Sequence, residues 1–163
     1  TEGTLSPALV VTVMALLGTA ASVLGNEASI RFGRRRLVAT AMILSIGFAA
    51  IVGFAGSTSY WLAVFLVIAY GVVVWLDSSS VTAGAAGNAE PARRGATLAV
   101  HSTLGYAGGF VGPLVVGWTL DLAGGMSPMA WGLAFLAVAV LMLLALGAFL
   151  IMRPANLAGE HGR

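Results

Sequence analysis

Long stretches without a charged side chain are the feature that most limits what this chain can fold into. Residues 3–26, 37–76, 95–120 and 122–152 contain no Asp, Glu, Lys or Arg. A helix that crosses a bilayer needs about 20 mostly apolar residues, so 37–76 is long enough for two such helices and each other stretch for one. Only 9% of the chain is charged, against roughly 25% in average soluble domains. We therefore expect an all-α, polytopic helical membrane protein.

The boundaries of the spans follow from charges and turn residues. The sequence predicts five transmembrane helices, at about 5–25, 37–56, 60–86, 95–121 and 129–152. The second is separated from the third by "GSTS" at 56–59, and the fourth from the fifth by "LAGGMSP" at 122–128. We expect the third helix to run through Asp77, because the residues that follow are small and uncharged, and to end at "GNAEPARRG".

All eight basic residues are arginines, and all follow the first, third or fifth predicted helix. The three groups are Arg31 with Arg34, Arg35 and Arg36; Arg93 with Arg94; and Arg153 with Arg163. In a chain with five spans these three places lie on the same side of the membrane. The other side carries only Glu2, the "GSTS" turn and Asp121. Since Lys and Arg accumulate in cytoplasmic loops, we predict an external N-terminus and a cytoplasmic C-terminus.

Polar and small side chains follow one face of the first, third and fourth predicted helices, because spacings of three, four or seven residues return to the same face. The first helix carries Thr12, Thr19, Ser22 and Asn26. The third carries Tyr70, Asp77, Ser80 and Gly84. The fourth carries His101, Gly105, Gly108, Gly109 and Gly112, with Pro113 next. The helices at 37–56 and 129–152 have no such face, so we expect them to face lipid.

Asp77 and His101 are the leading candidates for a solute or proton pathway. An Asp at mid-membrane costs about 2.5–3.5 kcal/mol on insertion scales, and such residues usually mark an ion, proton or substrate path. The alternatives are a structural hydrogen bond for Asp77 and a buried, hydrogen-bonded role for His101. The two lie at similar depth, so a direct pairing is open. The further pathway candidates on these faces are Tyr70, Ser80 and Thr19. Asp121 is expected to be an interface residue.

Glycine supplies 22 of the 163 residues, nearly double the average share of about 7%. Small residues let transmembrane helices approach closely, so close packing is the simpler interpretation of the glycine face over residues 105–112. A moving helix interface is the alternative, with a kink at Pro113.

No enzyme, metal or cofactor is expected. The chain has no cysteine, which excludes disulfides, thiol catalysis and thiolate metal sites. We find no paired carboxylates, no His/Glu metal spacing and no nucleophile motif. The basic residues are confined to connections instead of covering a face, so nucleic acid is not an expected partner either. The partner that the composition does predict is the lipid bilayer.

The connection "IRFGRRR", Ile30 to Arg36, resembles the loop signature of the major facilitator superfamily, commonly written G-x-x-x-D-R-x-G-R-R. The matching positions are Arg31, Gly33, Arg34 and Arg35. Two positions differ: Ile30 replaces the usual Asp, and Gly25 lies one residue too far upstream. Glu27 is a candidate replacement for the missing carboxylate. A second stretch, "GYAGGFVGPLVVGWTLD" at 105–121, resembles the glycine–proline helix that is fifth in a half-transporter or eleventh in the whole.

The resemblance implies a partial half-bundle of this family, helices eight to twelve of its C-terminal half. The helices at 37–56 and 129–152 then take the peripheral positions. The implied function is secondary-active transport of a small solute by alternating access, with proton coupling as an option, in a bacterial inner membrane. The implied partner is the missing N-terminal half or other membrane subunits. The arginines would fix orientation and latch the loop onto carboxylates or helix C-terminal carbonyls. The alternative function is a non-transporting, transporter-like subunit or assembly factor of a larger membrane complex.

Overall fold

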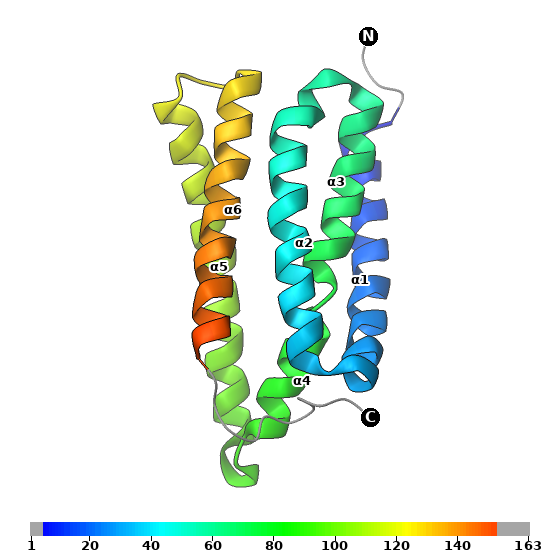
Figure 1. The fold of residues 1–163 in the computed structure, drawn as a ribbon, viewed down its shortest axis with the longest axis vertical. Helices are drawn as coiled ribbons and strands as arrows, with labels where there is room; N and C mark the ends of the chain where they lie inside the picture. The colour runs from blue at the N-terminus through cyan, green and yellow to red at the C-terminus, as the bar shows by residue number, and fades with distance from the viewer. Residues whose placement is uncertain (1–4, 153–163) are drawn as a thin grey trace.

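The computed structural model describes residues 5–152, and over that range it contains helices and no strand. The elements in chain order are α1 (Pro7–Phe32), α2 (Arg34–Ala55), the 3-10 turn η1 (Gly56–Thr58), α3 (Tyr60–Trp75), α4 (Ser78–Asn88), the 3-10 turn η2 (Pro91–Arg93), α5 (Arg94–Leu122) and α6 (Pro128–Ile151). They form five stretches long and apolar enough to cross a membrane, one of which combines α3 and α4 (Figure 1). The predicted all-α fold with five spans is confirmed.

Three of the long helices begin where the sequence offers a cap. Ser6, Ser59 and Ser127 precede α1, α3 and α6, and each hydroxyl accepts the backbone N–H three residues later, at 3.1–3.5 Å. A serine in this position satisfies one of the donors that the first turn of a helix leaves free. Pro7 and Pro128 fill the first helical position, where no N–H is needed.

The stretch between the first two spans is helical almost throughout, which corrects the predicted helix end at residue 25 and the predicted connection over residues 25–37. α1 continues to Phe32 and α2 begins at Arg34, so Gly33 alone joins them. Gly33 has φ 94°, a backbone conformation that residues with a side chain rarely adopt. Near the end of α1, Glu27 and Arg31 pair across one helical turn at 2.9 Å, which modestly favours the helix there.

The third span is broken, which corrects the prediction of a continuous helix over residues 60–86. α3 ends at Trp75 and α4 begins at Ser78. The N–H of Leu76 donates to the carbonyl of Val73 at 3.2 Å, three residues back instead of four, a tightening common at helix ends. The serines that follow Asp77 compete for backbone hydrogen bonds and weaken the helix. The small, uncharged residues after Asp77 were therefore not sufficient to make this span one continuous helix.

α2 packs most extensively on α6, and glycines set the closeness of that contact. A Cβ added to Gly53 would stand 2.7 Å from the Cβ of Phe135. A Cβ added to Gly132 would stand 2.5 Å from the ring of Phe54. Each glycine therefore accepts an aromatic residue of the opposite helix, and the two backbones approach closely.

This packing differs from the expectation that the second and fifth predicted helices mainly face lipid. Within the described chain, the span that contains α2 is the most buried, and the span that contains α5 has no buried residue in its most apolar window. Apolar lipid gives helices no hydrophobic drive to associate, so close contact between small residues decides which faces meet. The expectation is therefore wrong for α2, whereas α6 still exposes most of its large hydrophobic side chains in the described chain.

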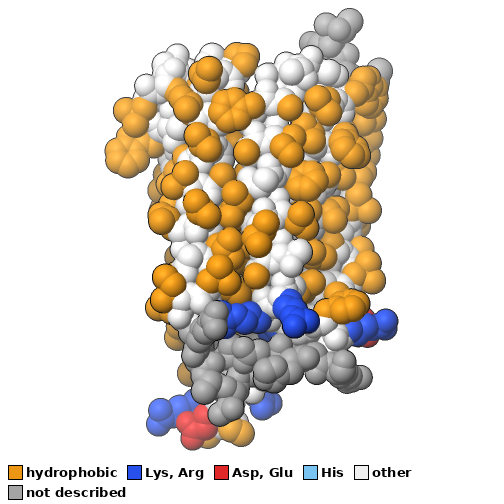
Figure 2. Space-filling view, in the orientation of Figure 1, with side chains coloured by type: hydrophobic (Ala, Val, Ile, Leu, Met, Phe, Trp, Pro, Cys, Tyr) orange, Lys and Arg blue, Asp and Glu red, His pale blue; other side chains and the backbone are white. Residues whose placement is uncertain are grey.

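The arginines of the described residues gather at one end of the bundle. They lie where α1 meets α2 and where α4 meets α5, and Figures 1 and 2 place both junctions at the lower end. Hydrophobic side chains cover the flank above them in Figure 2. Asp121 lies near the end of α5, at the opposite end of the bundle. Arg153 and Arg163 lie outside the described residues.

Candidate functional site

Asp77 lies at the break between α3 and α4, and α4 is capped by a different helix. Asp77 occupies the N-cap position of α4, but its side chain makes no capping hydrogen bond. Instead, the Ser22 hydroxyl of α1 accepts the N–H of Ser79 at 3.1 Å, and the two serine hydroxyls lie 2.5 Å apart. Ser22 is buried. A residue of α1 thus performs the task that an N-cap residue normally performs.

Gly25 lets the break between α3 and α4 lie directly against α1. A Cβ on Gly25 would overlap the carbonyl oxygen of Leu76, so only a glycine lets this carbonyl approach α1 so closely. Asn26 follows Gly25, one turn beyond Ser22. Its Oδ1 atom is buried and has no hydrogen-bond partner in the described part of the chain. This section of α1 therefore combines close backbone contact with a free polar acceptor inside a membrane span.

His101 connects α5 to α4 and does not meet Asp77. The Thr82 hydroxyl donates to the carbonyl of Ser78 at 3.1 Å and lies 3.2 Å from the His101 Nε2 atom. Because the hydroxyl proton is committed to Ser78, the arrangement favours an Nε2–H that donates to Thr82. Within residues 5–152 there is no ion pair between Asp77 and His101. The direct pairing that the sequence left open is not formed.

Ser80 and Gly84 lie against an arginine of the loop signature. Ser80 is fully buried, and its hydroxyl accepts from the Arg34 Nε atom at 3.4 Å. A Cβ added to Gly84 would stand 2.9 Å from the Arg34 Cδ atom. The Arg34 side chain therefore lies along α4 over one helical turn.

Tyr70 and Thr19 lie apart from this contact. The Tyr70 ring meets Phe135 of α6 edge-on, with 6.2 Å between ring centroids. Thr19 is exposed, and its hydroxyl donates to the carbonyl of Ala15 in its own helix at 2.9 Å. The five predicted pathway residues thus do not form one cluster. The residues that the structure adds at the break are Ser22, Gly25 and Ser79; the polar spacing in the first helix pointed to Ser22, and no local signal pointed to Ser79.

Arg35 reaches the far end of the chain's last described helix. Its Nη2 atom donates to the carbonyl of Leu150 at 3.1 Å, and its guanidinium lies 5.7 Å from the centre of the Phe149 ring. Leu150 is in the last turn of α6, where carbonyls lack intrahelical partners and the helix dipole favours a cation. This is one of the two kinds of contact expected for these arginines. Glu27, the candidate substitute carboxylate, pairs with Arg31.

The glycine face of α5 is open. No described atom lies within 4 Å of a Cβ built at Gly105, Gly108, Gly109 or Gly112. Pro113 lies inside α5 and does not end it. Nothing in the described chain packs closely on this face.

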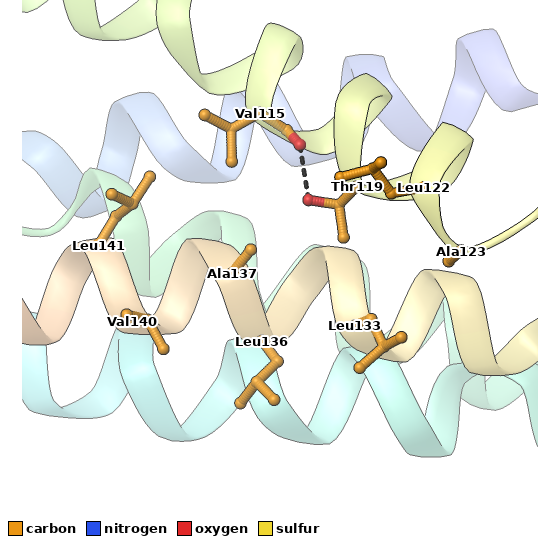
Figure 3. A pocket seen from close by; sticks show the side chains of 9 residues that line it. All are labelled: Val115, Thr119, Leu122, Ala123, Leu133, Leu136, Ala137, Val140 and Leu141. Atoms are coloured by element: carbon orange, nitrogen blue, oxygen red, sulfur yellow. Dashed lines mark hydrogen bonds between the residues drawn. The ribbon is translucent and has the colours of Figure 1, made fainter.

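A groove between α5 and α6 is apolar and does not resemble a solute site. It encloses about 540 Å³ and is lined by aliphatic residues of both helices (Figure 3). Thr119 contributes the hydroxyl in this lining, and that hydroxyl donates to the carbonyl of Val115 at 2.7 Å. Because the Thr119 proton is already donated to Val115, the lining offers few hydrogen-bonding groups to a polar solute. The polar break at Asp77 is therefore the better candidate site.

Comparison with known proteins identifies the family. The model of the Major Facilitator Superfamily matches residues 4–162. A Bacillus subtilis (strain 168) protein, described as the uncharacterised MFS-type transporter YfnC, is 29% identical over 154 residues, which cover 91% of this chain and 34% of that protein. The chain thus spans about a third of the length of this curated relative. No solved structure gives a significant match. Because the family match covers nearly the whole sequence, the chain belongs to the major facilitator superfamily, whose members are membrane transporters and not enzymes.

Proposed function

We propose that this chain is the C-terminal portion, helices eight to twelve, of a secondary-active transporter. It moves a small solute by alternating access, and a proton is the coupling ion. The observation that carries the proposal is Asp77, a carboxylate at a helix break inside a membrane span, with no capping bond of its own. Ionisable residues within spans usually mark a pathway, and broken helices often build transporter sites.

In this proposal the end that carries the arginines is cytoplasmic, and the membrane is a bacterial inner membrane. The α1–α2 and α4–α5 junctions at that end carry Arg31, Arg34, Arg35, Arg36, Arg93 and Arg94, and Asp121 lies near the opposite end of α5. The positive-inside rule supports this orientation. The C-terminus then lies in the cytoplasm.

The junction of α1 and α2 acts as a latch at the cytoplasmic end. Arg34 lies along α4 through Ser80, and Arg35 binds the C-terminal turn of α6 through Leu150. Two neighbouring arginines thus hold two different spans to the same junction. A rocking motion that opens the cytoplasmic side must either carry both spans together or break these contacts.

The partner in this proposal is the other half of the transporter, or membrane subunits that replace it. Alternating access needs a second bundle against which this one can rock. The open glycine face of α5 supports such a partner, because small residues are the surfaces on which transmembrane helices pack closely.

Uptake by the complete product of the gene tests the proposal. The protein is reconstituted in proteoliposomes under an imposed proton gradient, and a panel of radiolabelled amino acids, sugars, nucleosides and organic cations is screened. We expect saturable accumulation of one solute class that stops when a protonophore dissipates the gradient. Absence of uptake across the panel, together with stoichiometric co-purification with a larger membrane complex, would instead support the non-transporting subunit.

A further inference from the structure

The start of α4 lies inside a membrane span, where free backbone donors are costly. The first turn of any helix leaves up to four N–H groups without intrahelical partners. In hydrocarbon each unsatisfied group costs several kcal/mol, so an acceptor must be supplied. Asp is among the residues that most often supply it, and Asp77 stands in the N-cap position of α4. The expected local solution is thus a bond from the Asp77 carboxylate to the backbone of α4.

The structure uses another solution, and α1 provides both parts of it. Ser22 accepts the N–H of Ser79 at 3.1 Å, so one of the two donors that an N-cap carboxylate can reach is already satisfied, and Asp77 has helical backbone angles (φ −97°, ψ −9°) instead of the extended angles of a capping residue. Gly25, three residues later on α1, lets the Leu76 carbonyl lie where any Cβ would overlap it. The contact between Ser22 and Ser79 therefore exists only while the α3–α4 break lies directly against α1.

We propose that Ser22 and Gly25 are positioning residues for Asp77. By capping α4 from α1 and by admitting the Leu76 carbonyl, they keep the Asp77 carboxylate out of the N-terminus of α4 and available to the transport pathway. The pathway role of Asp77 rests on the proposed function, whereas the capping arrangement is measurable without any transport.

Carbodiimide labelling of Asp77 tests the proposal directly. The complete gene product is held in lipid nanodiscs and treated with dicyclohexylcarbodiimide, and mass spectrometry quantifies the adduct on the peptide that contains Asp77. Ser22→Ala removes the cap, so the carboxylate should take over the N–H of Ser79. Carbodiimide attacks protonated carboxyl groups, and a carboxylate that accepts a backbone N–H resists protonation, so labelling should fall about tenfold.

Two variants serve as controls for that experiment. Ser22→Thr keeps the hydroxyl and should keep wild-type labelling. Thr12→Val removes a hydroxyl of the same helix that bonds only to its own backbone, at the carbonyl of Ala8, and should also leave labelling unchanged. Equal labelling in wild type and Ser22→Ala would overturn the proposal, as would an Asp77 that is not labelled in the wild-type protein.

A cross-link provides a second measurement should Ser22→Ala fail to fold. These 163 residues contain no cysteine, so the double variant Ser22→Cys/Ser79→Cys introduces the only two thiols within them, and any cysteine elsewhere in the gene product is replaced by serine. It should oxidise readily to a disulfide between α1 and α4, whereas Thr12→Cys/Ser79→Cys should not. Failure of the first pair to cross-link would overturn the trans-helix cap. If labelling and cross-linking behave as expected but no solute is transported, the proposed function fails and the capping arrangement stands.

Discussion

At the scale of single residues, the chain contains two aspartates that the structure places in different settings. Asp77 is half-buried at a helix break within a span, and Asp121 is exposed near the end of α5. They have the same side chain, and each follows a leucine. Their positions in the predicted spans already separated them, and the structure adds that Asp77 lies at a break between two helices.

The two aspartates therefore form a matched pair for mutation. Asp77→Asn should lower proton-driven uptake by about tenfold or more, because the asparagine amide cannot bind and release the coupling proton. Asp121→Asn should leave uptake at the wild-type level. Uptake in proteoliposomes, at equal reconstituted protein, measures both. A pathway role for Asp77 is wrong if Asp77→Asn and Asp77→Leu both transport as well as wild type.

At the scale of helices, the contact between α2 and α6 depends on the absence of two side chains. Gly53 and Gly132 each face an aromatic residue of the other helix at a separation that leaves no space for a Cβ. Gly47 lies on α2 as well, but no described atom lies within 4 Å of a Cβ built there. One helix thus contains a glycine required by packing and a glycine that packing does not require.

Alanine substitution at Gly53 and at Gly47 should change the stability of the protein in different ways. Gly53→Ala should destabilise the protein by about 1–3 kcal/mol, since the new methyl group meets Phe135 and the Gly132 backbone. Gly47→Ala should be neutral or stabilising by up to about 1 kcal/mol, because alanine favours the helix. Unfolding in mixed detergent micelles, followed by circular dichroism, measures both. Equal midpoints for the two variants would contradict the close α2–α6 contact.

At the scale of the whole molecule, the distribution of arginines predicts the orientation in the membrane. Single cysteines at Ser57 and Ala92, both exposed and at opposite ends of the bundle, are the only ones in these 163 residues, and the parent protein without either serves as the background control. An impermeant maleimide applied to intact cells should label the cysteine at position 57 and not the one at 92. The reverse pattern would overturn the proposed topology.

The open face of the bundle predicts that these five spans do not transport alone. The exposed hydroxyls of Thr12 and Thr19 donate to carbonyls of their own helix. Exposing them to lipid therefore costs less free energy than exposing hydroxyls without a hydrogen-bond partner. Geometry prevents transport instead, because one bundle has no second bundle against which to rock. The 163-residue chain, reconstituted as a monomer, should give no saturable solute flux. Robust saturable flux from the monomer would refute the proposal that the chain is part of a transporter.

The sequence by itself determined the class of fold, the number of spans and the gathering of the arginines at one end. These properties follow from composition and spacing, because a bilayer excludes charge and requires spans of a set length. The loop signature and the glycine–proline stretch also pointed to the family. Each of these inferences uses residues that are close together in the chain.

Only the tertiary structure decided which residues meet. Ser79 and Ser22 are 57 positions apart, Arg35 and Leu150 are 115 apart, and no local pattern encodes either hydrogen bond. The break at Asp77 is likewise stable because α1 supplies a cap and a glycine, which local propensity does not register. In lipid, small residues and trans-helix hydrogen bonds determine helix association, and both depend on which faces are brought into contact. The polar faces were therefore visible in the sequence, whereas their partners were not.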